Sequence, residues 1–158
     1  LNKLNPAAPR VAADPGALAR HNQLYQLQGK ITVPTVTLTA LADHITPPGA
    51  TQHLVDQYAS SLSNGDSAEG LLVNIWNKPP DEYTTFTGQV PNKRTVAVNG
   101  VGHCNFTTSQ YMTVAKLLGA AAKSGKAPTA KTVSAAIKND SNLFVDPNYR
   151  APLLKYRQ

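Results

Sequence analysis

A histidine flanked by glycines is the residue of this sequence best suited to proton transfer. His103 stands within residues 100–106, after a short β-branched run at residues 95–98 and before residues 107–118, whose spacing predicts a helix. An imidazole just past the carboxyl end of a strand lies where open α/β sheets bind ligands, and it can act there as a general base. We therefore predict that His103 is catalytic, with packing under the following helix as the alternative.

A carboxylate follows a second strand-like run, sixty positions before the histidine. Residues 31–41 are rich in Val, Ile and Thr, which is typical of a buried parallel strand, and Asp43 follows two positions after them. Pro34 predicts that the strand begins after it. Because parallel strands end at one edge of a sheet, Asp43 and His103 can converge, and the carboxylate can fix the tautomer of the imidazole. We predict Asp43 as the acid partner, with capping of its own loop as the alternative.

A histidine and a carboxylate in this relation activate a serine hydroxyl, which is otherwise a poor nucleophile. In α/β sheets that serine stands in a Gly-x-Ser-x-Gly turn between a strand and a helix. The sequence contains no such turn, since the nearest string, residues 65–70, has the wrong spacing and follows a predicted helix. The first residue is Leu1. We therefore expect a processed chain, with the nucleophile and the oxyanion hole on another chain or on a missing segment.

Two loops carry a resemblance to a known family. Residues 42–48 resemble the acid loop of α/β-hydrolases, and residues 100–106 resemble their histidine loop; the similarity covers roughly residues 30–122. It implies an α/β fold: the C-terminal portion of an α/β-hydrolase parallel sheet with flanking helices, completed by a missing N-terminal segment or partner chain. It implies a hydrolase of small-molecule carboxylic esters that is inactive as this chain alone. Amidase, peptidase or dehalogenase activity in the same fold, and a non-catalytic binding subunit, are the alternatives.

The dipeptide His103-Cys104 is similar to one in secreted esterases of the tannase and feruloyl-esterase type, where the cysteine is bridged to another beside the nucleophilic serine. The resemblance implies an interchain disulfide at Cys104, the single cysteine of the sequence, and a secreted or periplasmic location. A free buried thiol is the alternative. We do not expect Cys104 to be the nucleophile, because a side chain adjacent to the base in sequence usually points away from it.

A Pro-rich polar stretch, residues 77–92, predicts an inserted loop, and long loops near active sites often shape substrate entry. Trp76, just before this loop, and Tyr83 and Phe86 within it are the candidates for substrate binding. Packing is the alternative role of all three aromatic rings.

The rest of the sequence predicts how the chain is divided and where its helices and strands lie. We expect an extended arm at residues 1–13, the hydrolase-like part at residues 14–138, and an irregular tail at residues 139–158. Capping and breaking residues, together with apolar spacing, predict helices over residues 14–28, 51–62, 107–123 and 129–137 and a further strand over residues 71–76.

Composition limits the kinds of partner. The 158 residues carry a net charge of +6, but the basic residues are scattered, so we expect no nucleic-acid binding. No apolar run is long enough to span a membrane. His44 and His53 are too far apart for a helical zinc pair, and adjacent His103 and Cys104 do not match zinc spacing, so we expect no metal and no cofactor.

Overall fold

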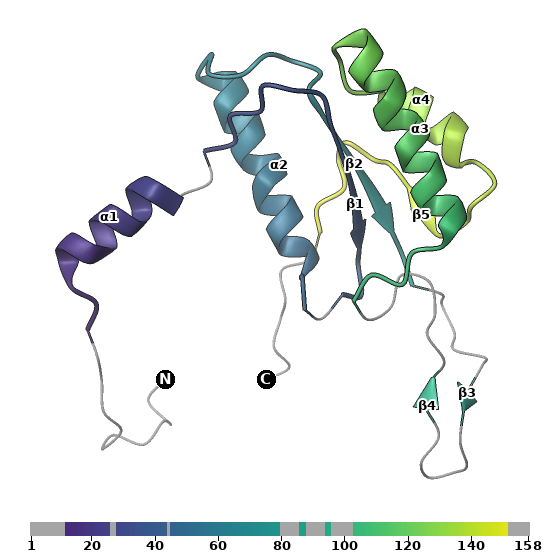
Figure 1. Cartoon of the computed structure of the whole chain (residues 1–158), viewed down its shortest axis with the longest axis horizontal. Helices are drawn as coiled ribbons and strands as arrows, with labels where there is room; N and C mark the ends of the chain where they lie inside the picture. The colour runs from purple at the N-terminus through teal and green to yellow at the C-terminus, as the bar shows by residue number, and fades with distance from the viewer. Residues whose placement is uncertain are drawn as a thin grey trace.

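A computed structural model describes residues 12–25, 28–43, 45–79, 86–87, 94–95 and 103–151. These residues form mixed α/β structure, in which helices cover both faces of a small sheet (Figure 1). The elements in chain order are α1 (Pro15–Tyr25), β1 (Thr35–Ala40), α2 (Pro48–Ser63), β2 (Leu72–Asn77), β3 (Phe86–Thr87), β4 (Arg94–Thr95), α3 (Thr108–Ser124), α4 (Ala130–Ile137) and β5 (Leu143–Phe144).

The main sheet has the order β1-β2-β5 and is mixed rather than parallel throughout. β1 and β2 are parallel over their full lengths, from Thr35 opposite Leu72 to Ala40 opposite Asn77. β5 is antiparallel to β2 and pairs only with its last two residues. The expectation of an all-parallel sheet is therefore wrong for this edge, where a tight turn after α4 folds part of the predicted irregular tail back onto β2.

The hydrophobic core lies on one face of this sheet. Val73 and Ile75 of β2 pack there against Leu117 of α3 and Val133 of α4, and Ile75 and Val133 are completely buried. α2 covers the other face, where Tyr58 accepts a hydrogen bond from the amide of Leu71 at 3.0 Å. The strands are thus held between helices on both faces, which fixes where their carboxyl ends lie.

Local sequence signals set most of the helix and strand boundaries. β1 begins directly after Pro34, as predicted. The Asp14 side chain accepts from the Ala17 amide at 2.8 Å and so caps α1. Thr107 and Gln110 form a capping box at the start of α3, and Thr129 caps α4. In the described residues α1 extends to Tyr25, and residues 26–27 of the predicted helix lie outside them.

The chain between β2 and α3 includes a separate antiparallel pair, β3 with β4. Thr95, the first residue of the strand predicted over residues 95–98, therefore belongs to this pair and not to the main sheet in the described part of the chain. Residues 96–102 lie outside the described residues, as do residues 80–85 and 88–93 of the predicted inserted loop.

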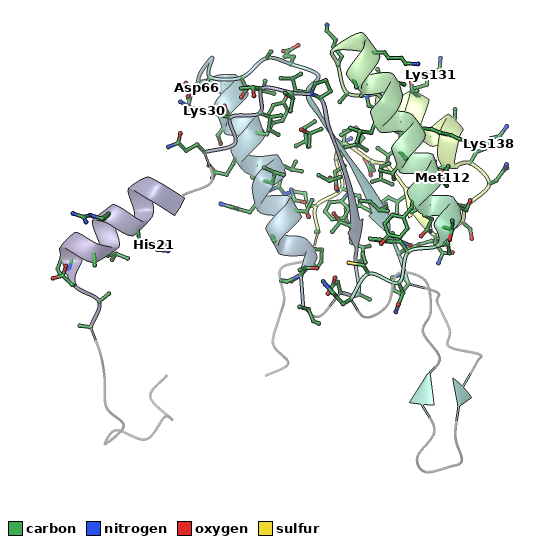
Figure 2. The ribbon with its side chains drawn as sticks, viewed as in Figure 1. His21, Lys30, Asp66, Met112, Lys131 and Lys138 are labelled. Carbon is green, nitrogen blue, oxygen red and sulfur yellow. The ribbon has the colours of Figure 1, made fainter. Side chains whose placement is uncertain are left out.

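Charged side chains are distributed over several elements. Lys131 and Lys138 extend from the α4 region, whereas Lys30 pairs with Asp66 at 3.3 Å between Nζ and Oδ1, at the opposite side of the sheet (Figure 2). The lack of a nucleic-acid partner stays a prediction. No helix within the described part of the chain is both long and apolar enough to cross a membrane.

Gly29 allows the segment before β1 to lie directly against α2. Its φ is +65°, and a Cβ at this position would lie 2.2 Å from the carbonyl carbon of Gln57. Gly65, after the end of α2, also has a positive φ of 75°, but a Cβ there would meet nothing within 4 Å. The two glycines therefore share a backbone requirement and differ in the space around them.

We expect Gly29→Ala to destabilise the protein more than Gly65→Ala. Both changes place an L side chain in the left-handed region, which costs about 1–2 kcal/mol. Gly29→Ala adds a clash with helix backbone, and overpacking of this kind costs a further ~1–3 kcal/mol. The free energies of unfolding of the two variants, measured by urea titration, test the difference, and equal losses would contradict a close approach at Gly29.

Candidate active site

The two predicted catalytic residues lie in contact. The distance from His103 Nδ1 to Asp43 Oδ2 is 3.0 Å. Asp43 follows the carboxyl end of β1, and His103 precedes α3. The side chain of Asp43 is only 1% exposed, whereas that of His103 is 54% exposed. With the proton on Nδ1 donated to the carboxylate, Nε2 is the basic nitrogen of the ring, and the largely exposed imidazole can accept a proton there.

Asp43 is surrounded by hydrogen-bond donors. Oδ1 accepts from the backbone amides of Ile45 at 2.8 Å and Thr46 at 2.9 Å. Oδ2 accepts from the Thr46 hydroxyl at 2.5 Å and the Cys104 thiol at 3.2 Å, in addition to His103. Asp43 therefore caps its own loop, which was the alternative role, and contacts the histidine at the same time.

These donors decide the charge of the buried carboxylate. Burial alone would raise the pKa of Asp43, but hydrogen bonds from the hydroxyl and amide of Thr46, the amide of Ile45 and the thiol of Cys104 outweigh it and hold that pKa well below its usual range. Asp43 is consequently ionised at neutral pH. An ionised carboxylate is the form that can orient an imidazole and stabilise its protonated state.

Cys104 turns toward the site, contrary to the expectation that it would point away from the base. Its φ is +75°, a left-handed conformation unusual for a residue with a side chain, and this backbone brings Sγ to Asp43. Burial, followed by the hydrogen bond to Asp43 and that residue's negative charge, raises the pKa of the thiol. The thiol is therefore protonated at neutral pH, a poor state for a nucleophile.

The same side chains could be considered as metal ligands, because the donor atoms of Asp43, His103 and Cys104 lie within 4.8 Å of one another. A metal would require a thiolate, yet the environment raises the pKa of the thiol. It would also compete with the three hydrogen bonds already made to Oδ2. These side chains fit a hydrogen-bonded catalytic pair better than a metal site.

A buried polar network, not recognised from the sequence, supports the chain that follows His103. Gln110 is 1% exposed; its Oε1 accepts from Thr107 N at 3.1 Å and Asn77 Nδ2 at 3.2 Å. Its Nε2 donates to Asp140 Oδ2 at 2.9 Å. The start of α3 is thereby fixed to the end of β2 and to the turn before β5. The Thr-x-x-Gln capping pattern is the sequence signal that could have identified Gln110.

The predicted substrate-binding aromatics are not brought to the site in the described residues. Trp76 is 2% exposed and contacts Tyr149 edge to face, with ring centroids 5.2 Å apart. This contact agrees with packing, the alternative role of Trp76, and its contact with a substrate stays a prediction. Tyr83 lies outside the described residues, as do His44 and the side chain of Phe86.

Comparisons of the chain with protein-family models, with curated proteins and with solved structures found no match. The geometry of the Asp43–His103 pair and of the elements that hold it remains as the indication of function.

We expect Asp43 to contribute to the pH dependence of stability. Its pKa is lowered on folding from an unfolded value of about 3.9, so its stabilising contribution is fully present above about pH 5 and is lost progressively as the pH falls below about 4. In Asp43→Asn this component is absent, and the free energy of unfolding should fall less between about pH 5 and pH 2 than in the wild type.

Urea titrations at several pH values check this expectation. Asp66→Asn, which removes a carboxylate that is 45% exposed, is the matched control. If the free energy of unfolding changes with pH equally in the wild type and in Asp43→Asn, the pKa of Asp43 is not lowered in the folded protein.

Proposed function

We propose that this chain supplies the acid and the base of a serine ester hydrolase related to the α/β-hydrolases, whose nucleophile lies on another chain or segment. The observation that carries the proposal is a buried, ionised Asp43 at 3.0 Å from Nδ1 of a largely exposed His103. The parallel strands β1 and β2 support it, because the acid follows the carboxyl end of β1, the usual place for catalytic groups in α/β sheets.

In the proposed reaction, Nε2 of His103 removes the proton from a serine hydroxyl as the serine oxygen attacks the ester carbonyl. The resulting imidazolium then protonates the departing alcohol, and an acyl-serine remains. Water, activated by the same nitrogen, releases the acid product and restores the serine. Asp43 stays ionised throughout and stabilises the imidazolium. Backbone amides of the serine-bearing part would stabilise the oxyanion.

The free edge of the sheet supports a partner that completes it. Among the described residues, β1 has a neighbour only on its β2 side. Thr35 N donates to Leu71 O at 2.7 Å, so the backbone of Thr35 pairs toward β2. In a parallel ladder the backbone groups of alternate residues point to opposite sides, so the residues of β1 between these present theirs at its other edge. A strand of the serine-bearing part could pair there and bring its own carboxyl end to the edge where Asp43 and His103 lie.

One side of α3 supports the same partner. The inner side of α3 packs on β1 and the core, and Thr113, Lys116 and Ala120 lie toward α4. The side away from α4 carries exposed apolar residues at helical spacing, with Tyr111 56% and Leu118 44% exposed. We call this side the α3 stripe; its residues are Tyr111, Ala115, Leu118 and Ala122.

The disulfide implied by the tannase-like dipeptide belongs to the same proposal. Cys104 is a free, half-buried cysteine in this structure. A bridge to a cysteine beside the serine would join the histidine loop to the nucleophile turn. It would also remove the thiol donor from Asp43 Oδ2 and leave that oxygen to Thr46 and His103.

In the assembled enzyme, we expect His103→Ala to lower kcat by a factor of about a thousand or more, because loss of the base leaves only binding and the oxyanion hole to accelerate the reaction. We expect Asp43→Asn to lower kcat severely as well, since an amide at this position favours the wrong tautomer of the imidazole. Hydrolysis of nitrophenyl esters under saturating substrate measures both effects.

His53→Ala is the control for these variants, because His53 is an exposed residue of α2 and its loss should leave kcat unchanged. Near-normal hydrolysis by His103→Ala, with the fold intact by circular dichroism, would overturn the proposed function.

The isolated chain should neither hydrolyse nitrophenyl esters nor remain monomeric. The edge of β1 without a neighbour among the described residues lies next to an apolar helix stripe, and such surfaces favour self-association. Leu118→Glu, which places a charge on the α3 stripe, should reduce that association in sedimentation velocity. Leu18→Glu changes a comparably exposed residue on α1 and is the control. A monomeric wild-type chain that hydrolyses these esters alone would show that the chain is a complete enzyme.

A further inference from the structure

We propose that Thr46 is the positioning residue of this site: its amide and hydroxyl bind both oxygens of Asp43 and so hold Oδ2 against Nδ1 of His103. The inference rests on the proposed function for its catalytic consequence. Its structural part concerns only the Asp43–His103 contact and can be tested without substrate.

The contacts of Thr46 differ from those of the other donors around Asp43. Thr46 N lies 2.9 Å from Oδ1 and Thr46 Oγ1 lies 2.5 Å from Oδ2. Ile45 reaches only Oδ1, and Cys104 reaches only Oδ2. A donor on each oxygen from a single residue fixes the rotation of the carboxylate about its Cβ–Cγ bond. That rotation decides which oxygen faces the imidazole.

The hydroxyl matters because Oδ2 is the oxygen that meets His103. Without it, the amides of Ile45 and Thr46 would still bind Oδ1, and the loop would keep its turn. Oδ2 would keep the weaker thiol donor of Cys104 and would be less restrained. The hydroxyl of Thr46 is also the hydrogen bond that does most to lower the pKa of Asp43, which agrees with a close and directed contact.

The side-chain environment of Thr46 allows a clean substitution. Thr46 itself is exposed, although the carboxylate that it binds is 3% exposed. Thr46→Val replaces the hydroxyl by a methyl group of similar size and keeps the amide, and Thr46→Ser keeps the hydroxyl. Thr46→Ala provides a second variant without the hydroxyl, should the added methyl group of valine disturb the loop.

The experiment measures modification of histidines in the 158-residue chain by diethyl pyrocarbonate, followed by peptide mass spectrometry. A histidine that donates its Nδ1 proton to a carboxylate is held in the tautomer whose unprotonated Nε2 is free to react with the reagent. His103 should therefore react faster than His53, an exposed histidine of the same molecule. The ratio of the two rates reports the Asp43–His103 contact and corrects for reagent and concentration.

We expect this ratio to fall toward unity in Thr46→Val and Thr46→Ala and to keep its wild-type value in Thr46→Ser. Thr113→Val, which removes a hydroxyl bonded to the Ser109 carbonyl on α3, should leave the ratio unchanged. A wild-type ratio in both Thr46→Val and Thr46→Ala would overturn the proposal. An equal fall in Thr46→Ser, with a matching loss in the urea midpoint, would also overturn it, because the role would then be structural.

Kinetics of the assembled enzyme separate this proposal from the proposed function. Thr46→Val should lower kcat about tenfold with little change in KM, since supporting partners of a catalytic group act on its orientation. If the wild type does not hydrolyse esters but the modification ratios follow the expected pattern, the proposed function fails and the positioning role stands. If hydrolysis needs His103 but Thr46→Val changes neither the ratio nor kcat, the positioning role fails and the function stands.

Discussion

The site depends on keeping a carboxylate charged in a place that water does not reach. Transfer of an isolated ion out of water costs several kcal/mol unless hydrogen bonds or an opposite charge replace its hydration. Asp43 is 3% exposed, and five donors surround its two oxygens. Four of these donors come from residues within three positions of Asp43 or adjacent to His103 in the sequence. The loops that bring the acid and the base together are thus also the loops that make an ionised acid possible.

The parallel pair of strands explains how residues sixty positions apart meet. β1 and β2 remain in register over six residues each, and both end at the same edge of the sheet. α2 makes the crossover between them, and the polar network of Gln110 fixes the return of the chain into α3. In the connection from β2 to His103, the described pair β3–β4 forms a sheet separate from the main one.

Much of this arrangement could be predicted from the sequence because short-range rules decide it. Pro34 marked the start of β1, and the caps at Thr107 and Thr129 marked α3 and α4. β5 and the contact of Trp76 with Tyr149 could not be predicted, because both depend on where the tail returns to the sheet rather than on local propensity. The direction of the Cys104 side chain depends on a positive φ that its residue type does not suggest.

The unequal exposure of the two catalytic candidates argues for a partner rather than for a complete site. A general base works best where water is excluded, since electrostatic effects are stronger there and competing reactions are prevented. Here the side chain of Asp43 is 1% exposed, but that of His103 is 54% exposed. The edge of β1 that has no neighbour among the described residues and the α3 stripe lie on the part of the molecule that a further strand and its covering helix would extend. Under the proposed function, one partner bound there would supply the nucleophile and exclude water from His103 in the same step.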